Sequence, residues 1–276
     1  MKIFAFSDEA SSELSGQIAA MKRNGLDGTE IRGVNGQNIT SCTLKEASGI
    51  LRQLKDSGLT VWSVGSPIGK IPLDEGSFDA HLDLLRRTLE IANALECANI
   101  RMFSFYLPEG VKAELCRNKV TDRLAQMAEI AEGTGIALCH ENEKGIYGDT
   151  AARSADLLEA VPSLRCVFDP ANFIQCGQNV PEAWKLLGAR VFYMHIKDAA
   201  ADGTVVPAGR GIGHLPEILA DYTRRGGTAV TVEPHLRVFD GFEALEKNRK
   251  TAIPGSVYPS ADAAFDAACA ALKQML

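Results

Sequence analysis

The fold is decided by the stretch Ile136-Ala137-Leu138-Cys139-His140-Glu141-Asn142-Glu143, in which a short apolar run ends abruptly in carboxylates. A strand buried on both faces of a parallel sheet is apolar along its length. Acids at its carboxyl end therefore need a cation or a reacting proton as a partner. Three later stretches repeat this pattern. Each is an apolar, β-prone run that ends in one side chain able to bind a metal ion: Val167-Phe168-Asp169, Val191-Phe192-Tyr193-Met194-His195 and Ala229-Val230-Thr231-Val232-Glu233.

The alternation of strand and helix segments predicts a (β/α)8 TIM barrel, as a single domain over residues 1–276. Strand starts recur roughly every 30 residues, which is typical of this architecture rather than of an open doubly wound sheet. A glycine-rich phosphate motif after the first strand is absent, which disfavours a dinucleotide-binding fold. The expected strands are 3–6, 28–32, 60–64, 100–103, 136–143, 165–168, 191–195 and 229–233, and the helices 11–24, 43–57, 77–95, 121–132, 150–160, 181–187, 214–224 and 262–275.

Composition excludes several classes of protein. With 276 residues and 46% hydrophobic side chains, the chain can bury a large core. The formal net charge of −6 disfavours nucleic acid as a partner, because phosphate backbones select for an excess of Lys and Arg. The seven cysteines are odd in number, scattered and without a Cys-x-x-Cys pair, so no disulfide framework or thiolate zinc site is indicated. No stretch resembles a signal peptide or a membrane span, and we therefore expect a cytoplasmic protein.

The residues that end these four runs, Glu141, Asp169, His195 and Glu233, form the expected functional site. Active sites of (β/α)8 barrels lie at the carboxyl ends of the strands, where all four residues fall. Three carboxylates and one imidazole make a hard, mainly oxygen site, which suits Mn²⁺ or Mg²⁺ and also accepts Co²⁺ or Zn²⁺ through the histidine. The sequence thus predicts one divalent metal ion, with Mn²⁺ as the expected ion, held by Glu141, Asp169, His195 and Glu233.

Residues near these ligands are expected to line the rim of the site. Side chains alternate along a strand, so the residue two positions after a ligand shares its face. This pattern places Glu143, Lys197 and His235 beside a substrate. Arg210, within Gly209-Arg210-Gly211, is a further residue suited to an anionic group, although a surface arginine between glycines fits the same pattern. His140 faces the other way and is expected to pack and form a hydrogen bond.

Four motifs together resemble the signature of the xylose-isomerase-like TIM barrel superfamily, in its sugar phosphate isomerase/epimerase branch. They are Glu141-Asn142, Asp169-Pro170-Ala171-Asn172, His195-Ile196-Lys197-Asp198 and Val232-Glu233, and the resemblance covers nearly the whole chain. It implies that Glu141 and Glu233 exchange protons with the substrate besides binding the metal. It also implies that Lys197 reaches the sugar. Asn172, within the second motif, is a further expected substrate contact. Asn172 stands where ketose 3-epimerases often have His, and Glu143 where many relatives have His, so the resemblance does not specify the substrate.

The resemblance implies a metal-dependent isomerase or epimerase acting on a small keto- or aldo-sugar, phosphorylated or not. One carboxylate removes the proton next to a carbonyl to give an ene-diolate, and the other returns it. Two other functions stay open. Glu143, Tyr147 and His235 are compatible with a lyase or dehydratase acting on an inosose, a 3-keto-glycoside or a related keto-substrate. A non-catalytic sugar-binding or partner-dependent barrel is the third alternative.

The longest stretch outside the repeat pattern is 237–259, which follows the last expected strand. It carries four cationic residues, Arg237, Lys247, Arg249 and Lys250. At that position we expect a lid over the catalytic end of the barrel or a contact in a homo-oligomer.

Overall fold

The computed structural model describes residues 1–74, 76–239, 252–253 and 257–276, and shows a closed barrel of eight parallel strands. The predicted fold is confirmed. The barrel strands hydrogen-bond to one another in chain order, and the first pairs with the last to close the ring. They are β1 (Lys2–Ala5), β2 (Gly28–Ile31), β5 (Thr60–Gly65), β6 (Asn99–Met102), β7 (Ala137–Glu141), β8 (Arg165–Phe168), β9 (Val191–Ile196) and β12 (Ala229–Val232).

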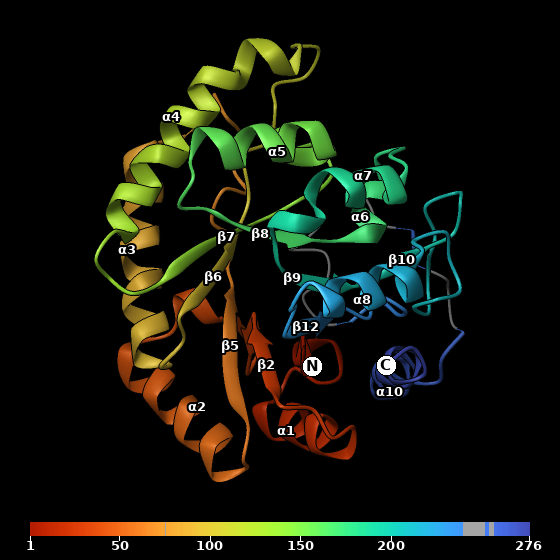
Figure 1. Cartoon of the computed structure of the whole chain (residues 1–276). Coiled ribbons are helices and arrows are strands. Elements are labelled where there is room, and N and C mark those ends of the chain that lie inside the picture. The colour runs from red at the N-terminus through yellow and green to blue at the C-terminus, as the bar shows by residue number, and fades with distance from the viewer. Residues whose placement is uncertain (75, 240–251, 254–256) are drawn as a thin grey trace.

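Helices surround the strands, with α2, α3 and α4 along one side in Figure 1. Their buried residues recur at helical spacing, so each helix packs one apolar face on the barrel. On α4 this face runs through Cys116 and Val120, which is why the helix begins at Ala113 and not at residue 121 as expected. The helices are α1 (Leu14–Arg23), α2 (Leu44–Asp56), α3 (Phe78–Ala94), α4 (Ala113–Ala131), α5 (Ala151–Ala160), α6 (Pro170–Gln175), α7 (Val180–Leu187), α8 (Leu215–Arg224) and α10 (Ala261–Lys273).

Short elements at the carboxyl ends of the strands were not expected from the sequence. Helix α6 follows β8 directly: the carboxylate of Asp169 caps it by accepting the backbone N–H of Asn172, and Pro170 occupies the first turn. Two antiparallel pairs are further examples: β3 (Gly33–Val34) with β4 (Gln37–Asn38), and β10 (Asp198–Ala199) with β11 (Val205–Val206).

The barrel interior is filled by an aromatic cluster below the carboxyl ends of the strands. Phe4 and Trp62 stack with ring centroids 5.1 Å apart, and Phe192 stacks on Trp62 at 5.7 Å. Tyr193 packs edge-on against Trp62 and is fully buried. Such layers make the interior of a (β/α)8 barrel a packed core rather than a pore. The functional site therefore has a rigid aromatic floor.

Two sequence expectations concern regions outside the barrel. Among the described residues, no helix combines the length and the apolar character needed to cross a bilayer. Most of the stretch 237–259 lies outside the described residues, so the expectation of a lid or an oligomer contact there stays a prediction.

Candidate metal centre

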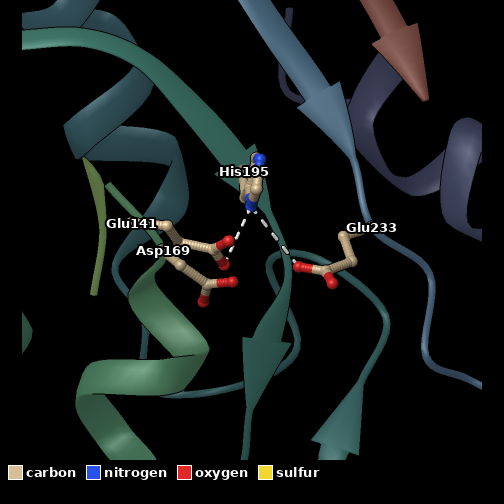
Figure 2. Close-up of side chains that lie close together, drawn as sticks. All are labelled: Glu141, Asp169, His195 and Glu233. Atoms are coloured by element: carbon tan, nitrogen blue, oxygen red, sulfur yellow. Dashed lines mark hydrogen bonds and ion pairs between the residues drawn. The ribbon is translucent and has the colours of Figure 1, made fainter. Parts of the chain in front are cut away.

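The four predicted ligands meet at the carboxyl end of the barrel, with their ligand atoms all within 4.8 Å of one another. His195 Nδ1 lies 3.1 Å from an oxygen of Glu141 and 3.5 Å from an oxygen of Glu233. Figure 2 shows Glu141 and Asp169 approaching His195 from one side and Glu233 from the other. Glu141 ends β7, His195 is the penultimate residue of β9, and Asp169 and Glu233 follow their strands by one residue, so barrel closure brings the four together.

This donor set fits a divalent metal ion. Ligand atoms roughly 2.0–2.6 Å from one shared ion lie at most about 5 Å apart, which agrees with the spacing of the cluster. Burial raises the pKa of Asp169 to about 7, and the neighbouring carboxylates of Glu233 and Glu141 act in the same direction. The cluster therefore concentrates negative charge that a cation would stabilise. Three carboxylates and one imidazole suit Mn²⁺, Mg²⁺, Co²⁺ or Zn²⁺.

Lys197 places its ammonium group between two of these ligands. The Nζ atom lies 2.9 Å from Asp169 Oδ2 and 2.9 Å from Glu233 Oε2. Burial alone would lower the pKa of Lys197, but the carboxylates of Asp169 and Glu233 raise it well above its usual range. Lys197 is thus a fixed positive charge beside the predicted metal site.

A cavity of about 290 Å³ opens beside the cluster. Glu141 and Glu233 line this cavity, whereas Asp169 and His195 are fully buried and are not among its lining residues. The cavity volume suits a small molecule. Apolar and aromatic side chains supply part of the wall: Pro67, Ile71, Leu84, Phe103 and Tyr106.

The predicted substrate contacts Asn172 and Glu143 both line the cavity. The side-chain amide of Asn172 donates to Glu141 Oε1 at 3.2 Å, so it fixes the direction of that carboxylate. Glu143 forms an ion pair of 3.0 Å with Lys70. Burial alone would raise the pKa of Glu143, but Lys70 and other cations lower it to about 2. Glu143 is therefore a paired anion at the cavity wall.

The predicted contact His235 also lines the cavity, and Glu9 binds it at two points. Glu9 accepts the backbone N–H of His235 at 2.7 Å, and its other oxygen lies 3.0 Å from His235 Nδ1. Arg32 connects this pair to the metal cluster, because it lies 3.1 Å from Glu9 and 3.7 Å from Glu233. The orientations of His235 and Glu233 are thus linked through Glu9 and Arg32.

The expectation that Arg210 contacts the substrate is not supported, because Arg210 is exposed and does not line the cavity. The glycines on either side of Arg210 are explained by packing around a buried carboxylate. The buried carboxylate of Asp198 accepts the backbone N–H groups of Gly209, Gly211 and Gly213. A Cβ atom at Gly211 would lie only 2.3 Å from Asp198 Oδ1. The Gly-Arg-Gly pattern therefore reflects close packing around a carboxylate.

Hydrogen bonds of His140 and Tyr147 bear on what was expected of these two residues. His140 is buried on the outer side of β7 and lies 3.0 Å from Ser104 Oγ, as expected for a packed, hydrogen-bonded histidine. The hydroxyl of Tyr147 donates to Asp156 on α5, and Tyr147 is not among the residues that line the cavity. The expectation that Tyr147 lies at the rim of the site is therefore not supported.

Sequence reasoning missed two charged residues inside the barrel, Glu30 on β2 and Arg101 on β6. Glu30 Oε2 lies 3.1 Å from His195 Nε2, and Arg101 Nε lies 3.2 Å from Glu141 Oε2. Both are buried, and Arg101 lines the cavity. The available signal was a charged residue within an expected barrel strand, because burying such a charge is costly unless it is paired.

Comparisons with known proteins agree with this architecture. A family model described as xylose isomerase-like TIM barrel matches residues 18–254, whereas no curated protein matches the chain. Among solved structures, the zinc-bound IolI protein aligns with a TM-score of 0.74 at 16% identity, over 100% of this chain and 98% of that one. A probable 3-DHS dehydratase, AsbF from Bacillus anthracis, has a TM-score of 0.75 at 18% identity, over 99% of each chain.

A D-psicose 3-epimerase, solved in the presence of D-fructose, aligns with a TM-score of 0.73 at 19% identity, over 99% of this chain and 98% of that one. At such identities these structures establish the fold alone. The family model is the stronger finding, because it covers well over half of the sequence. The chain therefore belongs to the xylose isomerase-like TIM barrel family.

Proposed function

We propose that this protein is a divalent-metal-dependent isomerase or epimerase acting on a small keto- or aldo-sugar. The observation that carries the proposal is the division of the four ligands. Glu141 and Glu233 line the cavity and approach His195 from two sides, whereas Asp169 and His195 are fully buried. Two carboxylates thus face a substrate, and the other two ligands only hold the ion.

This arrangement provides two proton carriers for one substrate. A bound divalent ion would polarise a carbonyl and its neighbouring hydroxyl, which lowers the pKa of the C–H bond between them. Either Glu141 or Glu233 accepts that proton, which leaves an ene-diolate, and the other carboxylate delivers a proton to carbon. Delivery to the opposite face of the same carbon gives an epimer, and delivery to the adjacent carbon moves the carbonyl.

Neighbouring residues orient these groups and the sugar. The Asn172 amide holds Glu141, and the Lys197 ammonium holds Glu233 and Asp169. In the proposed complex Lys197, Asn172, Glu143 and His235 also contact sugar hydroxyls. Mn²⁺ is the proposed ion, because three of the four ligands are carboxylates.

Hydrogen exchange at carbon tests the proposal directly. Protein loaded with Mn²⁺ is incubated with a panel of ketoses and aldoses, free and phosphorylated, in deuterated water. Proton abstraction next to the carbonyl introduces deuterium at that carbon, which NMR and mass spectrometry detect. The matched control is the Glu141→Gln, Glu233→Gln double variant. Absence of deuterium from every sugar, with metal bound, would reject the isomerase proposal.

A lyase or dehydratase is the second proposed function, and it is supported by the acids at the cavity wall. His235 lines the cavity 3.6 Å from Glu233, where an imidazole is placed to pass a proton to a leaving hydroxyl. One structural neighbour is described as a probable dehydratase. The mass of the product separates the two functions, because isomerisation conserves mass and dehydration removes one water.

A further inference from the structure

His195 presents its two ring nitrogens to two different sets of carboxylates. Nδ1 faces the metal cluster, at 3.1 Å from Glu141 and 3.5 Å from Glu233. Nε2 points away from the cluster and lies 3.1 Å from Glu30 Oε2. A neutral imidazole carries one proton, and only its unprotonated nitrogen binds a metal. Nδ1 faces the cluster, so an ion bound there would leave the ring proton on Nε2, beside Glu30.

We propose that Glu30 is the residue that positions His195 for metal binding. Its carboxylate accepts the Nε2 proton, which fixes the ring orientation and leaves the Nδ1 lone pair facing the cluster. Ligating histidines are commonly held by such an outer carboxylate, which also makes the nitrogen a stronger donor. The inference rests on the metal centre of the proposed function, and it adds a residue that the four-ligand motif does not contain.

The surroundings of Glu30 hold its carboxylate in this direction. Glu30 Oε1 accepts the hydroxyl of Tyr193 at 3.0 Å, and the same hydroxyl lies 3.3 Å from Ser63 Oγ. Tyr193 precedes His195 by two residues on β9, so both side chains point into the barrel. The aromatic floor around Trp62 packs against the Tyr193 ring. A rigid chain of contacts therefore runs from the floor through Tyr193 and Glu30 to His195.

An alternative role for Glu30 is to neutralise Arg101. The distances favour His195, because Arg101 Nε is 3.7 Å from Glu30 but 3.2 Å from Glu141. Arg101 also donates to the backbone carbonyl of Ser66. Arg101 therefore has closer partners than Glu30, whereas no other carboxylate among the described residues is recorded at His195 Nε2.

Metal affinity is the first test, measured by calorimetry with Zn²⁺ and with Mn²⁺ alone. Glu30→Gln keeps the size of the side chain and loses the charge, and we expect binding to weaken about 10- to 100-fold. Glu30→Asp keeps the charge but shortens the side chain, and the same loss is expected if the contact itself matters. Tyr193→Phe keeps the Glu30 carboxylate but removes one hydroxyl that holds it, so binding should weaken less than in Glu30→Gln.

The second measurement uses NMR to locate the ring proton of His195. Zinc-loaded protein labelled with ¹⁵N in its five histidines should show His195 protonated on Nε2 and metal-bound through Nδ1. In Glu30→Gln the Nε2 proton should exchange with water faster, which a purely structural role for Glu30 would not produce. If Glu30→Gln does not fold, Glu30→Asp provides both measurements.

The outcomes separate this inference from the function on which it rests. A wild-type protein that binds no divalent ion rejects the metal centre, and with it both proposals. A wild type that binds metal, with variants of Glu30 that bind within twofold and keep the Nε2 proton protected, overturns the positioning role alone. Weaker binding with a faster-exchanging Nε2 proton supports it.

Discussion

Glu233 has two tasks in the proposed centre, since it holds the ion and moves a proton. Glu233→Gln keeps the shape and one oxygen ligand but removes the base. We expect turnover to fall by roughly 10²–10⁴ while metal binding weakens only modestly. Metal content and steady-state kinetics measured on the same sample test this. Glu143→Gln is the comparison at the cavity wall: Glu143 pairs with Lys70 and holds no metal, so this change should affect the Michaelis constant more than turnover or metal content. Near-normal turnover of metal-loaded Glu233→Gln would contradict the two-glutamate mechanism.

Lys197 is expected to oppose metal binding while it favours substrate binding. Its ammonium lies 2.9 Å from oxygens of both Asp169 and Glu233, so it repels a dication placed between them. In Lys197→Met we expect metal binding to tighten by about tenfold. The Michaelis constant should rise more than turnover falls, because the sugar loses a contact. Calorimetry and kinetics measure the two effects, and Lys197→Arg, which keeps the charge, should not tighten binding. Weaker metal binding in Lys197→Met would show that Lys197 organises the ligands instead.

At the level of elements, helix α3 contacts the loop after β5 through one buried histidine. The Gly69 N–H donates to His81 Nε2 at 2.8 Å, and no side chain other than hydrogen fits residue 69, because a Cβ would lie 2.0 Å from the carbonyl oxygen of Phe103. Burial, with a smaller contribution from Arg123, lowers the pKa of His81 to about 4. The folded protein thus keeps His81 neutral under conditions where an unfolded histidine, with a pKa near 6.5, is protonated.

This contact makes stability depend on pH in a defined direction. The contribution of His81 is fully present above pH 6.5 and is lost as the pH falls from 6.5 towards 4, since only the unfolded state binds the proton there. His81→Gln offers an oxygen to the Gly69 N–H and does not titrate. Urea unfolding at pH 7 and pH 4.5 should therefore show a smaller loss of stability in His81→Gln than in wild type. Equal losses in both proteins would contradict the role of His81.

At the scale of the whole molecule, metal binding should be visible as stabilisation. An ion that binds only the folded state, at a concentration of 100 times its dissociation constant, adds about 2.7 kcal/mol. For a chain of this length we expect the melting temperature to rise by roughly 5–10 °C. Thermal unfolding with and without Mn²⁺ measures it, and His195→Ala, which lacks one ligand, should show no shift at the same concentration. An unshifted wild type that also holds no metal would favour a non-catalytic barrel.

The sequence by itself determined the barrel and the cluster of four residues predicted to hold a metal. Apolar runs and helical spacing are local signals, and parallel strands leave all their carboxyl ends at one edge. A residue such as Asp169 at the end of β8 is therefore assigned to the site without knowing any distance. Lys197, Glu143 and His235 followed from their spacing to the ligands, Asn172 followed from the family resemblance, and each lines the cavity. Arg210 was inferred from its charge alone and does not line the cavity, because a loop has no fixed periodicity from which to infer its direction.

Only the tertiary structure decided how those ligands are held. Glu30 and His195 are 165 residues apart and meet across the interior, and Glu9 and His235 are 226 residues apart. Lys70 reaches Glu143 from a loop 73 residues away. The neighbours of Glu30 in the chain, Thr29 and Ile31, carry no information about what lies opposite. Closure of the ring fixes which side chains face each other inside it, and the second layer of the site exists only once the ring has closed.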